Sequence, residues 1–262
     1  MLHGKYTPNP AKAKIGVVLT IPATGSEMNP SFVISRLSTS DKRASEHESC
    51  YPYFAIVDPC HSMTVPDNHV RNGLVDAFVH IYEQYIGHFE KNPVIDAECE
   101  GVMKVLMKVA NQTIENPNDY QARATFCYAA TVALNYTLTC GIDECWGAHR
   151  IGHELTAYYG LAHAETLTLA MPAVMRFHKE KNEQKLIQFG REVFNLKNHS
   201  AEDTIIQCEE WFVSLGMKIR LSEWGYTDIH FNDIVSKFDS RPCGRYKDID
   251  TKGAWKILKL LE

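Results

Sequence analysis

The 262-residue chain lacks the run of about 20 hydrophobic residues that a membrane-spanning helix needs. Residues 1–8 contain no hydrophobic core, so they do not resemble a secretory signal. Positive charge is not in excess either, because 27 Lys and Arg residues stand against 32 Asp and Glu residues, for a formal net charge of -5. We therefore expect a cytoplasmic protein whose main partner is neither nucleic acid nor a membrane surface.

Several catalytic motifs are also missing from the sequence. It contains no G-x-x-x-x-G-K phosphate loop, no G-x-G-x-x-G dinucleotide fingerprint and no G-x-S-x-G nucleophile elbow. Its eight cysteines include no C-x-x-C pair, which argues against a zinc ribbon and a thioredoxin-type redox site. Scattered cysteines in a chain without a signal are expected to be reduced residues of the core.

The composition is that of an ordinary globular protein, with 45% hydrophobic and 23% charged residues. Short β-branched runs separated by turn-forming residues predict strands over residues 15–21, 31–35 and 53–57. This strand-and-turn segment has too few apolar residues to form a core alone. We predict that residues 1–66 are a β-rich segment.

Beyond residue 66 the pattern becomes helical. Val70, Leu74, Phe78 and Ile81 recur at three- and four-residue steps, and Asp67 is placed to cap the start of this first helix. Further helices are expected over residues 96–111, 120–138, 149–159, 163–179, 183–194, 201–215 and 254–261. The predicted fold is therefore mainly α, with an all-α domain over residues 67–262 that is large enough to bury a core.

One carboxylate lies within the apolar pattern of the first predicted helix. Asp76 and His80 are four residues apart, so their side chains share one face of the helix. A buried carboxylate is costly unless it is paired or binds a cation. Two interpretations remain open for this pair: a structural Asp–His hydrogen bond, which is the commoner case, or part of a metal site.

A second group of histidines follows in the sequence. His149 and His153 share a helical face, and His163 follows the break at Gly160, where a turn can bring it back beside them. Together with the carboxylate and histidine of the first helix they offer oxygen and nitrogen ligands that suit a divalent first-row ion such as Fe²⁺ or Zn²⁺. These five candidate ligands outnumber the roughly four coordination positions of such an ion. At least one of them therefore has another role, and some can be ordinary core histidines.

Three ordered stretches of the chain resemble the iron-containing (group III) alcohol dehydrogenases. They are residues 19–29 (LTIPATGSEMN), 72–80 (NGLVDAFVH) and 146–157 (WGAHRIGHELTA), the last continuing through GLAHA at 160–164. The resemblance is strongest to the branch of NAD(P)-dependent butanol dehydrogenases and broad-specificity aldehyde reductases. It extends from about Gly16 to the C-terminus.

The resemblance implies a two-domain architecture, in which a nucleotide-binding α/β domain precedes an all-α metal domain of the dehydroquinate-synthase-like type. It implies that a divalent metal, Fe²⁺ or Zn²⁺, is held by Asp76, His80, His149 and His163. His153 then lies near the substrate and the nicotinamide, where we expect it to relay the hydroxyl proton, because imidazole ordinarily titrates near neutral pH.

The resemblance also assigns part of the cofactor site. Thr20, Thr24, Lys42 and Thr64 fall where the β-rich segment of the family lines NAD(P). The family has its glycine-rich pyrophosphate-binding turn upstream of the stretch that aligns with Gly16, and this chain has almost nothing there. We therefore expect residues 1–66 to be the remnant of a nucleotide-binding domain that is mostly absent.

The expected activity is hydride transfer between NAD(P)(H) and a small primary alcohol or aldehyde, by a metal-dependent homo-oligomer. An alternative is a catalytically silent metal-binding or assembly fragment of such an enzyme. A third hypothesis, an all-α metal-dependent phosphohydrolase of the His-Asp type, ranks last, because none of the twelve histidines is followed by Asp.

Overall fold

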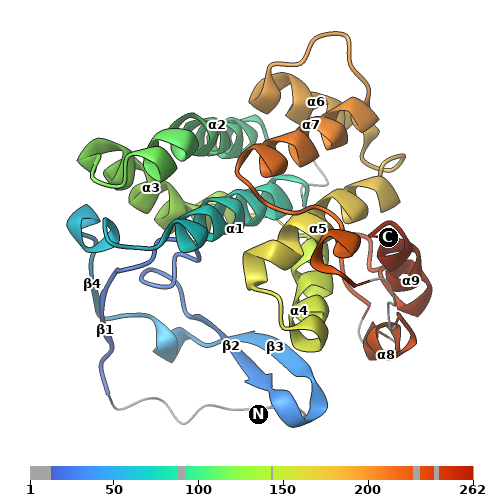
Figure 1. Ribbon diagram of the computed structural model, residues 1–262, viewed down its shortest axis with the longest axis horizontal. Coiled ribbons are helices and arrows are strands. Elements are labelled where there is room, and N and C mark those ends of the chain that lie inside the picture. The colour runs from blue at the N-terminus through green and yellow to red at the C-terminus, as the bar shows by residue number, and fades with distance from the viewer. Residues whose placement is uncertain (1–12, 88–91, 143, 227–230, 239–241, 262) are drawn as a thin grey trace.

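The computed structural model describes residues 13–87, 92–142, 144–226, 231–238 and 242–261. Its strands form two small sheets at one end of the molecule (Figure 1). β1 (Gly16–Val18) pairs in parallel with β4 (Phe54–Ile56), and β2 (Ser31–Arg36) pairs with β3 (Asp41–Glu46) in an antiparallel hairpin. The predicted strand over 15–21 shortens to three residues, and the polar strand β3 was not predicted.

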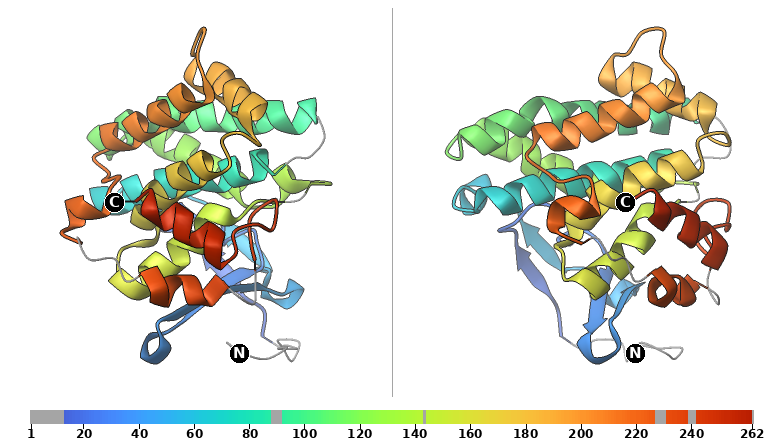
Figure 2. Two further views of the ribbon diagram at one scale, coloured as in Figure 1. Left: turned by 90° about the vertical axis from the view of Figure 1, so that its right-hand side faces the viewer. Right: turned by 45° about the vertical axis from the view of Figure 1, so that its right-hand side comes forward.

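The rest of the described chain is mainly helical, which confirms the predicted fold class. The helices are α1 (Asp67–Tyr85), α2 (Pro93–Glu115), α3 (Tyr120–Ala133), α4 (Gly147–Tyr159), α5 (His163–Phe177), α6 (Glu183–Phe194), α7 (Ala201–Ser214), α8 (Phe231–Val235) and α9 (Thr251–Lys259). Helices α2, α3, α6 and α7 lie on one side of α1 and α5, while α4 and the strands lie on the other side (Figures 1 and 2).

Two details of the predicted helices are wrong. Asp67 is the first residue of α1 rather than its cap, because Pro66 precedes the helix and supplies no side-chain hydrogen bond. The predicted helix over 120–138 ends at Ala133, and a short 3-10 helix follows at Thr137–Thr139. Side-chain amides replace the missing helical donors: Gln84 donates to the carbonyl of Ala133, and Asn29 donates to the carbonyl of Leu134.

Helix α1 lies in the middle of the core. Leu74, Val75, Phe78 and Ile81 are fully buried on different sides of this helix. The Phe78 ring lies 4.3 Å, centroid to centroid, from the ring of Trp211 on α7. Since a helix that is covered on all sides exposes none of its polar groups, every ionisable side chain on α1 within this stretch needs a partner inside the protein.

The loop between β1 and β2 docks on the helical body. The Asn29 amide donates hydrogen bonds to the carbonyls of Thr24 (2.8 Å) and Leu134 (3.0 Å). The buried Glu27 carboxylate accepts a hydrogen bond from the Thr131 hydroxyl on α3. These bonds hold the loop against the C-terminal end of α3, and so fix the β-rich segment relative to the helices.

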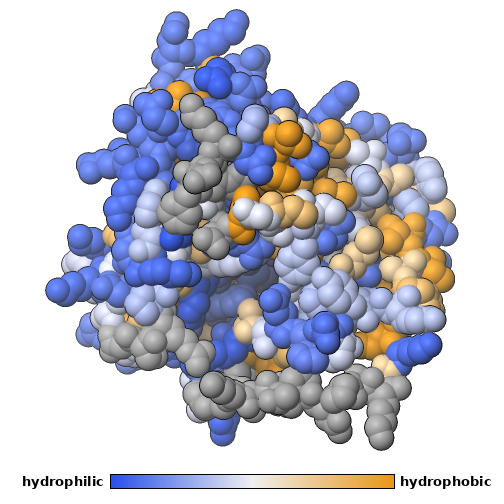
Figure 3. Space-filling model, turned by 180° about the vertical axis from the view of Figure 1, so that it is seen from behind, coloured by the Kyte–Doolittle hydropathy of each residue, from blue (hydrophilic) through white to orange (hydrophobic). Residues whose placement is uncertain are grey.

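The parallel pair β1–β4 leaves much of its apolar surface exposed. Val18, Phe54 and Ile56 are each about half exposed, at 49%, 56% and 48%. Hydrophobic atoms gather on the side of the molecule where these strands lie (Figure 3). Parallel strands are usually covered on both faces, so this pair is unusual. The division into domains at residue 66 stays a prediction.

Two further predictions about the whole chain can be compared with the structure. All eight cysteines are free thiols, as expected, and Cys99, Cys127, Cys145 and Cys208 are buried. Cys60 and Cys140 are exposed, so the prediction that the cysteines lie in the core is wrong for these two. Among the described residues, no helix is both long and apolar enough to cross a membrane.

Gly73 allows the loop to approach α1, which gives a test of the packing. A Cβ atom at this position would overlap the Pro22 carbonyl oxygen, a backbone atom that cannot move aside cheaply. We expect Gly73→Ala to destabilise the protein by about 1–3 kcal/mol in urea unfolding. Gly101→Ala on α2 is the matched control, because its Cβ meets nothing within 4 Å and Ala favours helix. Equal urea midpoints of unfolding for Gly73→Ala and Gly101→Ala would contradict this account of the packing.

Candidate metal centre and adjoining cavity

Helix α1 supplies three buried ionisable side chains on one face. Asp76, His80 and Glu83 are spaced by four and three residues, so successive turns of the helix bring them to the same side. All three are almost fully buried, with at most 4% of each residue exposed. The Nδ1 atom of His80 lies 3.6 Å from Oδ1 of Asp76, which is too long for a hydrogen bond.

Helices α4 and α5 supply the other histidines through a tight corner. His149 and His153 are one turn apart on α4, which ends at Gly160 in a left-handed conformation with φ of 70°. The chain then reverses, and α5 begins at His163. The ring centroid of His163 consequently lies 5.3 Å from that of His149 and 5.1 Å from that of His153. The turn expected after Gly160 is therefore present.

Three of the predicted ligands form a compact group. One ligand atom from each of Asp76, His149 and His163 lies within 4.8 Å of the other two. Oδ1 of Asp76 lies 3.9 Å from Nε2 of His149 and 3.6 Å from Nε2 of His163. The three residues come from three helices, so the fold brings together side chains that are up to 87 positions apart in the sequence.

The donor atoms in this group fit a divalent cation. Among the described residues, Oδ1 of Asp76 and Nε2 of His149 are buried and have no hydrogen-bond partner. Burial lowers the pKa values of His149 and His163 well below the ordinary value, which favours neutral imidazoles with a free lone pair. One carboxylate oxygen and imidazole nitrogens are ligands that suit Fe²⁺ or Zn²⁺.

His80 lies beside the group rather than within it. Its ring centroid is 4.4 Å from that of His149, and its buried Nδ1 also has no hydrogen-bond partner in the described part of the chain. Its nitrogens do not belong to the set of atoms within 4.8 Å of one another. The structure thus places His80 at the edge of the site, and its predicted role as a ligand remains a prediction.

Sequence reasoning missed Glu83, which contacts the site directly. Its carboxylate lies 2.5 Å from Nδ1 of His149, and it accepts the backbone N–H groups of Ala148 and His149 at 2.7 and 3.0 Å. Burial raises the pKa of Glu83 to about 7, although these N–H donors act in the opposite direction. The available signal was its position seven residues after Asp76, on the same face of an apolar helix.

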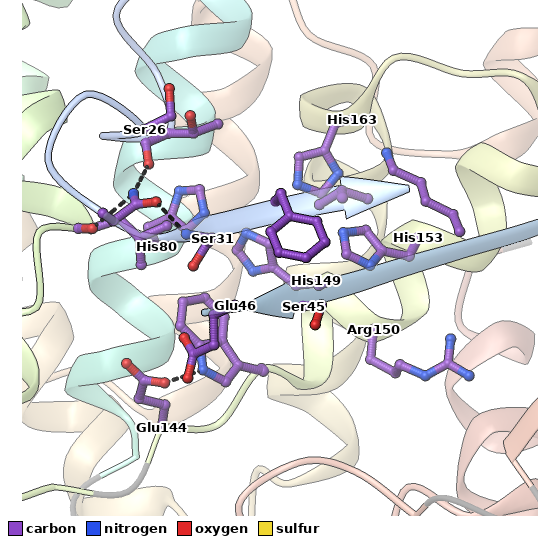
Figure 4. A pocket seen from close by; sticks show the side chains of 18 of the residues that line it. Ser26, Ser31, Ser45, Glu46, His80, Glu144, His149, Arg150, His153 and His163 are labelled. Atoms are coloured by element: carbon purple, nitrogen blue, oxygen red, sulfur yellow. Dashed lines mark hydrogen bonds between the residues drawn. The ribbon is translucent and has the colours of Figure 1, made fainter. Parts of the chain in front are cut away.

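A cavity of about 710 Å³ opens next to the histidines, between the β2–β3 hairpin and α4. His80, His149, His153 and His163 all line it, and Figure 4 shows their rings around the same space. This volume is within the range of small-molecule sites.

The predicted cofactor residues divide into two pairs in the structure. Thr24 and Lys42 line the cavity. Thr20 and Thr64 are exposed and do not line it. Lys42 lies on β3 and is half-buried; burial lowers the pKa of its ammonium, and the Asp76 carboxylate raises it in part. Lys42 and Thr24 are therefore the two positioned to meet a bound molecule.

Burial changes what His153 can do. It lowers the pKa of the imidazole to about 3, and the nearby His149 and Lys42 act in the same direction. The lowered pKa favours a neutral ring at pH 7, whereas the expected proton relay relied on an imidazole that titrates near neutral pH, so the relay role of His153 stays a prediction. A neutral imidazole can still donate one hydrogen bond and accept another.

The other end of the cavity is polar and acidic. Glu46 accepts a hydrogen bond from the Tyr136 hydroxyl at 2.7 Å, and Ser31 bonds the same hydroxyl at 2.8 Å. The indole N–H of Trp146 donates to Glu144, whose pKa is raised by burial. Trp146 lines the cavity and adopts a left-handed backbone with φ of 51°.

A polar network fixes the hairpin that covers the cavity. Lys237 contacts the Glu154 carboxylate on α4 at 3.1 Å and also donates to the carbonyl of Ser40, at the tip of the hairpin. Arg150 forms an ion pair with the same glutamate, and its guanidinium lies 4.5 Å from the centre of the Phe238 ring. The cavity wall is thus attached to α4 by charged side chains with little exposure.

Comparison with known proteins identifies the family. The profile described as "Fe-containing alcohol dehydrogenase family, C-terminal" matches residues 71–259, and the profile "Iron-containing alcohol dehydrogenase" matches residues 2–59. The chain therefore belongs to the iron-containing alcohol dehydrogenase family, as its motifs indicated.

Individual relatives agree with this assignment. "NADP-dependent alcohol dehydrogenase 3" of Entamoeba histolytica is 58% identical over 97% of this chain and 66% of its own length. "NADPH-dependent aldehyde reductase YqhD" of Escherichia coli is 38% identical over 86% of this chain and 59% of its own length. The chain thus spans about two thirds or less of these curated relatives.

Solved structures show the same fold. The crystal structure of Escherichia coli YqhD superimposes with a TM-score of 0.92 at 34% identity, covering 95% of this chain and 66% of that one. NADH-dependent butanol dehydrogenase A from Thermotoga maritima gives a TM-score of 0.93 at 31% identity, covering 99% and 68%.

The depressed pKa of His153 predicts the pH dependence of the metal-free chain. Because the unfolded imidazole titrates near 6.5 and the folded one near 3, the unfolded chain binds a proton that the folded chain excludes. Stability should therefore fall as the pH drops from 6.5 toward 3. Nuclear magnetic resonance titration of histidine-labelled protein should show a neutral His153 at pH 5. A His153 midpoint near 6.5 would contradict the burial argument.

Proposed function

We propose that this protein acts as a metal-dependent alcohol dehydrogenase or aldehyde reductase, with a small primary alcohol or aldehyde as substrate and NAD(P)(H) as cofactor. The observation that carries the proposal is the group of Asp76, His149 and His163, whose buried ligand atoms converge beside a cavity. Membership of the iron-containing family supports the same assignment.

The proposed ligands are Asp76, His149 and His163, with His80 as the fourth. A bound divalent ion supplies Lewis-acid polarisation of the substrate oxygen. The protein's part is to hold a neutral, low-dielectric pocket around the reacting atoms. Buried imidazoles with lowered pKa values do so without adding positive charge of their own.

His153 is the proposed residue that touches substrate. It is buried on the cavity wall, one turn from His149, with its ring 5.1 Å from that of His163. As a neutral imidazole it can bond to the substrate hydroxyl or to the nicotinamide and orient either one. This role requires only a hydrogen bond at neutral pH, in keeping with its lowered pKa.

The nicotinamide end of the cofactor is proposed to enter the cavity between the hairpin and α4. Thr24 and Lys42 offer a hydroxyl and a cation on the hairpin side. Thr20 and Thr64 were predicted to meet the same cofactor, and their exposed positions suit a part of it outside the cavity. The relatives are named for NADP, NADPH or NADH, so the proposal includes both forms of the cofactor.

The alternative function, a silent metal-binding or assembly fragment, rests on a different observation. The exposed apolar surface of β1 and β4 is the kind that becomes buried on association, and it also supports the predicted homo-oligomer. The metal site is common to both functions, so cofactor binding distinguishes them.

Metal content tests the ligand assignment. We expect stoichiometric divalent metal in the wild-type chain by inductively coupled plasma mass spectrometry, and its loss in His149→Ala and His163→Ala, because each removes a buried nitrogen donor. His199→Ala is the control, since that ring bonds the Ile187 carbonyl and does not line the cavity. Stoichiometric metal retained in both site variants would show that the assignment is wrong.

Cofactor titration tests the dehydrogenase proposal against the silent fragment. We expect NADPH or NADH to bind the chain with a micromolar dissociation constant, and Lys42→Ala to weaken binding by about tenfold, as for loss of one charge-assisted hydrogen bond. Lys179→Ala is the control, because that lysine is paired with Glu202 outside the cavity. No detectable binding of either NADPH or NADH by the metal-loaded wild type would favour the silent fragment.

A further inference from the structure

Glu83 does not belong to the compact ligand group, yet it is the carboxylate most tightly bound to it. Its Oε1 accepts the backbone N–H of Ala148 at 2.7 Å, and its Oε2 accepts the backbone N–H of His149 at 3.0 Å. Oε2 also lies 2.5 Å from Nδ1 of the His149 ring. The side chain is 1% exposed, so water does not compete for these bonds.

These contacts make Glu83 the cap of a neighbouring helix. Helix α4 begins at Gly147, and Trp146, the residue before it, contributes no side-chain hydrogen bond to the free N–H groups of the first turn. Glu83 satisfies two of those N–H groups from α1, and its own carbonyl accepts the N–H of Cys145 at 3.1 Å. A carboxylate at this end of the helix also faces the favourable end of the helix dipole.

The same contacts determine which nitrogen of His149 is free. Both Glu83 oxygens already accept backbone N–H groups, so the carboxylate is arranged to accept from Nδ1 as well. A neutral imidazole carries one N–H, and if that hydrogen is on Nδ1, Nε2 has a bare lone pair. Nε2 is the atom that lies 3.9 Å from Oδ1 of Asp76 and has no partner among the described residues.

We propose that Glu83 is a positioning residue that prepares His149 as a metal ligand, by holding its Nδ1 hydrogen and so directing an unprotonated Nε2 toward Asp76 and His163. The inference rests on the proposed metal site, and it adds a residue that acts through His149 and does not touch the ion. The two buried carboxylates of α1 then have separate tasks. Asp76 keeps one oxygen free for the ion, whereas Glu83 uses both oxygens to hold the first turn of α4 and the ring of His149 in place.

Metal titration of Glu83→Gln tests this proposal. Glutamine keeps the size of the side chain, but it replaces one acceptor oxygen with an NH₂ donor. That donor would face the N–H groups that Glu83 now accepts. With Zn²⁺ alone as the probe, we expect affinity to fall by about 10–100-fold, as for other partners of metal-bound histidines. The matched control is Glu100→Gln, a buried carboxylate that accepts from Tyr85 and Gln188 outside the cavity. A folded Glu83→Gln protein with wild-type Zn²⁺ affinity would overturn the proposal.

A second measurement is made on the wild-type chain, so it does not require Glu83→Gln to fold. Nitrogen chemical shifts of ¹⁵N-histidine-labelled, metal-free protein report the tautomer, and His149 is assigned by the signal lost in His149→Gln. We expect the Nδ1–H tautomer, and the Nε2–H tautomer would overturn the proposal. If the wild type binds no Zn²⁺ but shows the Nδ1–H tautomer, the proposed function fails while the contact to Glu83 stands.

Discussion

The site depends on one physical constraint, the burial of ionisable side chains on α1. This helix passes through the middle of the core, yet it carries Asp76, His80 and Glu83 on one face. A buried carboxylate without a partner is strongly destabilising, so each one has to be satisfied from within the protein or by a cation. Glu83 is satisfied by the first turn of α4. Asp76 is left with an oxygen that faces two imidazole nitrogens. A divalent ion is a partner that this oxygen and both nitrogens can coordinate.

The remaining elements complete this arrangement. The left-handed residue Gly160 lets α5 start beside α4, which returns His163 to the other ligands. The β2–β3 hairpin covers the open side and brings Lys42 to the cavity. Lys237, on the segment after α8, attaches this hairpin to α4 through Glu154. The contacts of the hairpin and of Lys237 join segments far apart in the sequence, so the cavity exists only in the folded chain.

Much of this could be predicted from the sequence, because the signals are local. The three- and four-residue spacing predicts α1, and the pair of Asp76 and His80 follows from the same spacing. The failures have non-local causes. Strand β3 reads Asp-Lys-Arg-Ala-Ser-Glu, a polar run that forms a strand because it pairs with β2. Helix α3 ends early because Gln84 and Asn29, distant in the sequence, bind its last carbonyls. Glu83 was overlooked because its partners lie more than 60 residues away on α4.

X-ray absorption spectroscopy of the Zn²⁺-loaded wild-type chain tests the central claim most directly, because the method reports the atoms bound to the ion. The proposed ligands contain oxygen and imidazole nitrogen and no sulfur. The account therefore predicts a first shell of nitrogen and oxygen at about 2.0–2.1 Å, together with the outer scattering of imidazole rings. A shell containing sulfur at about 2.3 Å, which would place one of the eight cysteines on the ion, would contradict it. So would an oxygen shell without imidazole scattering.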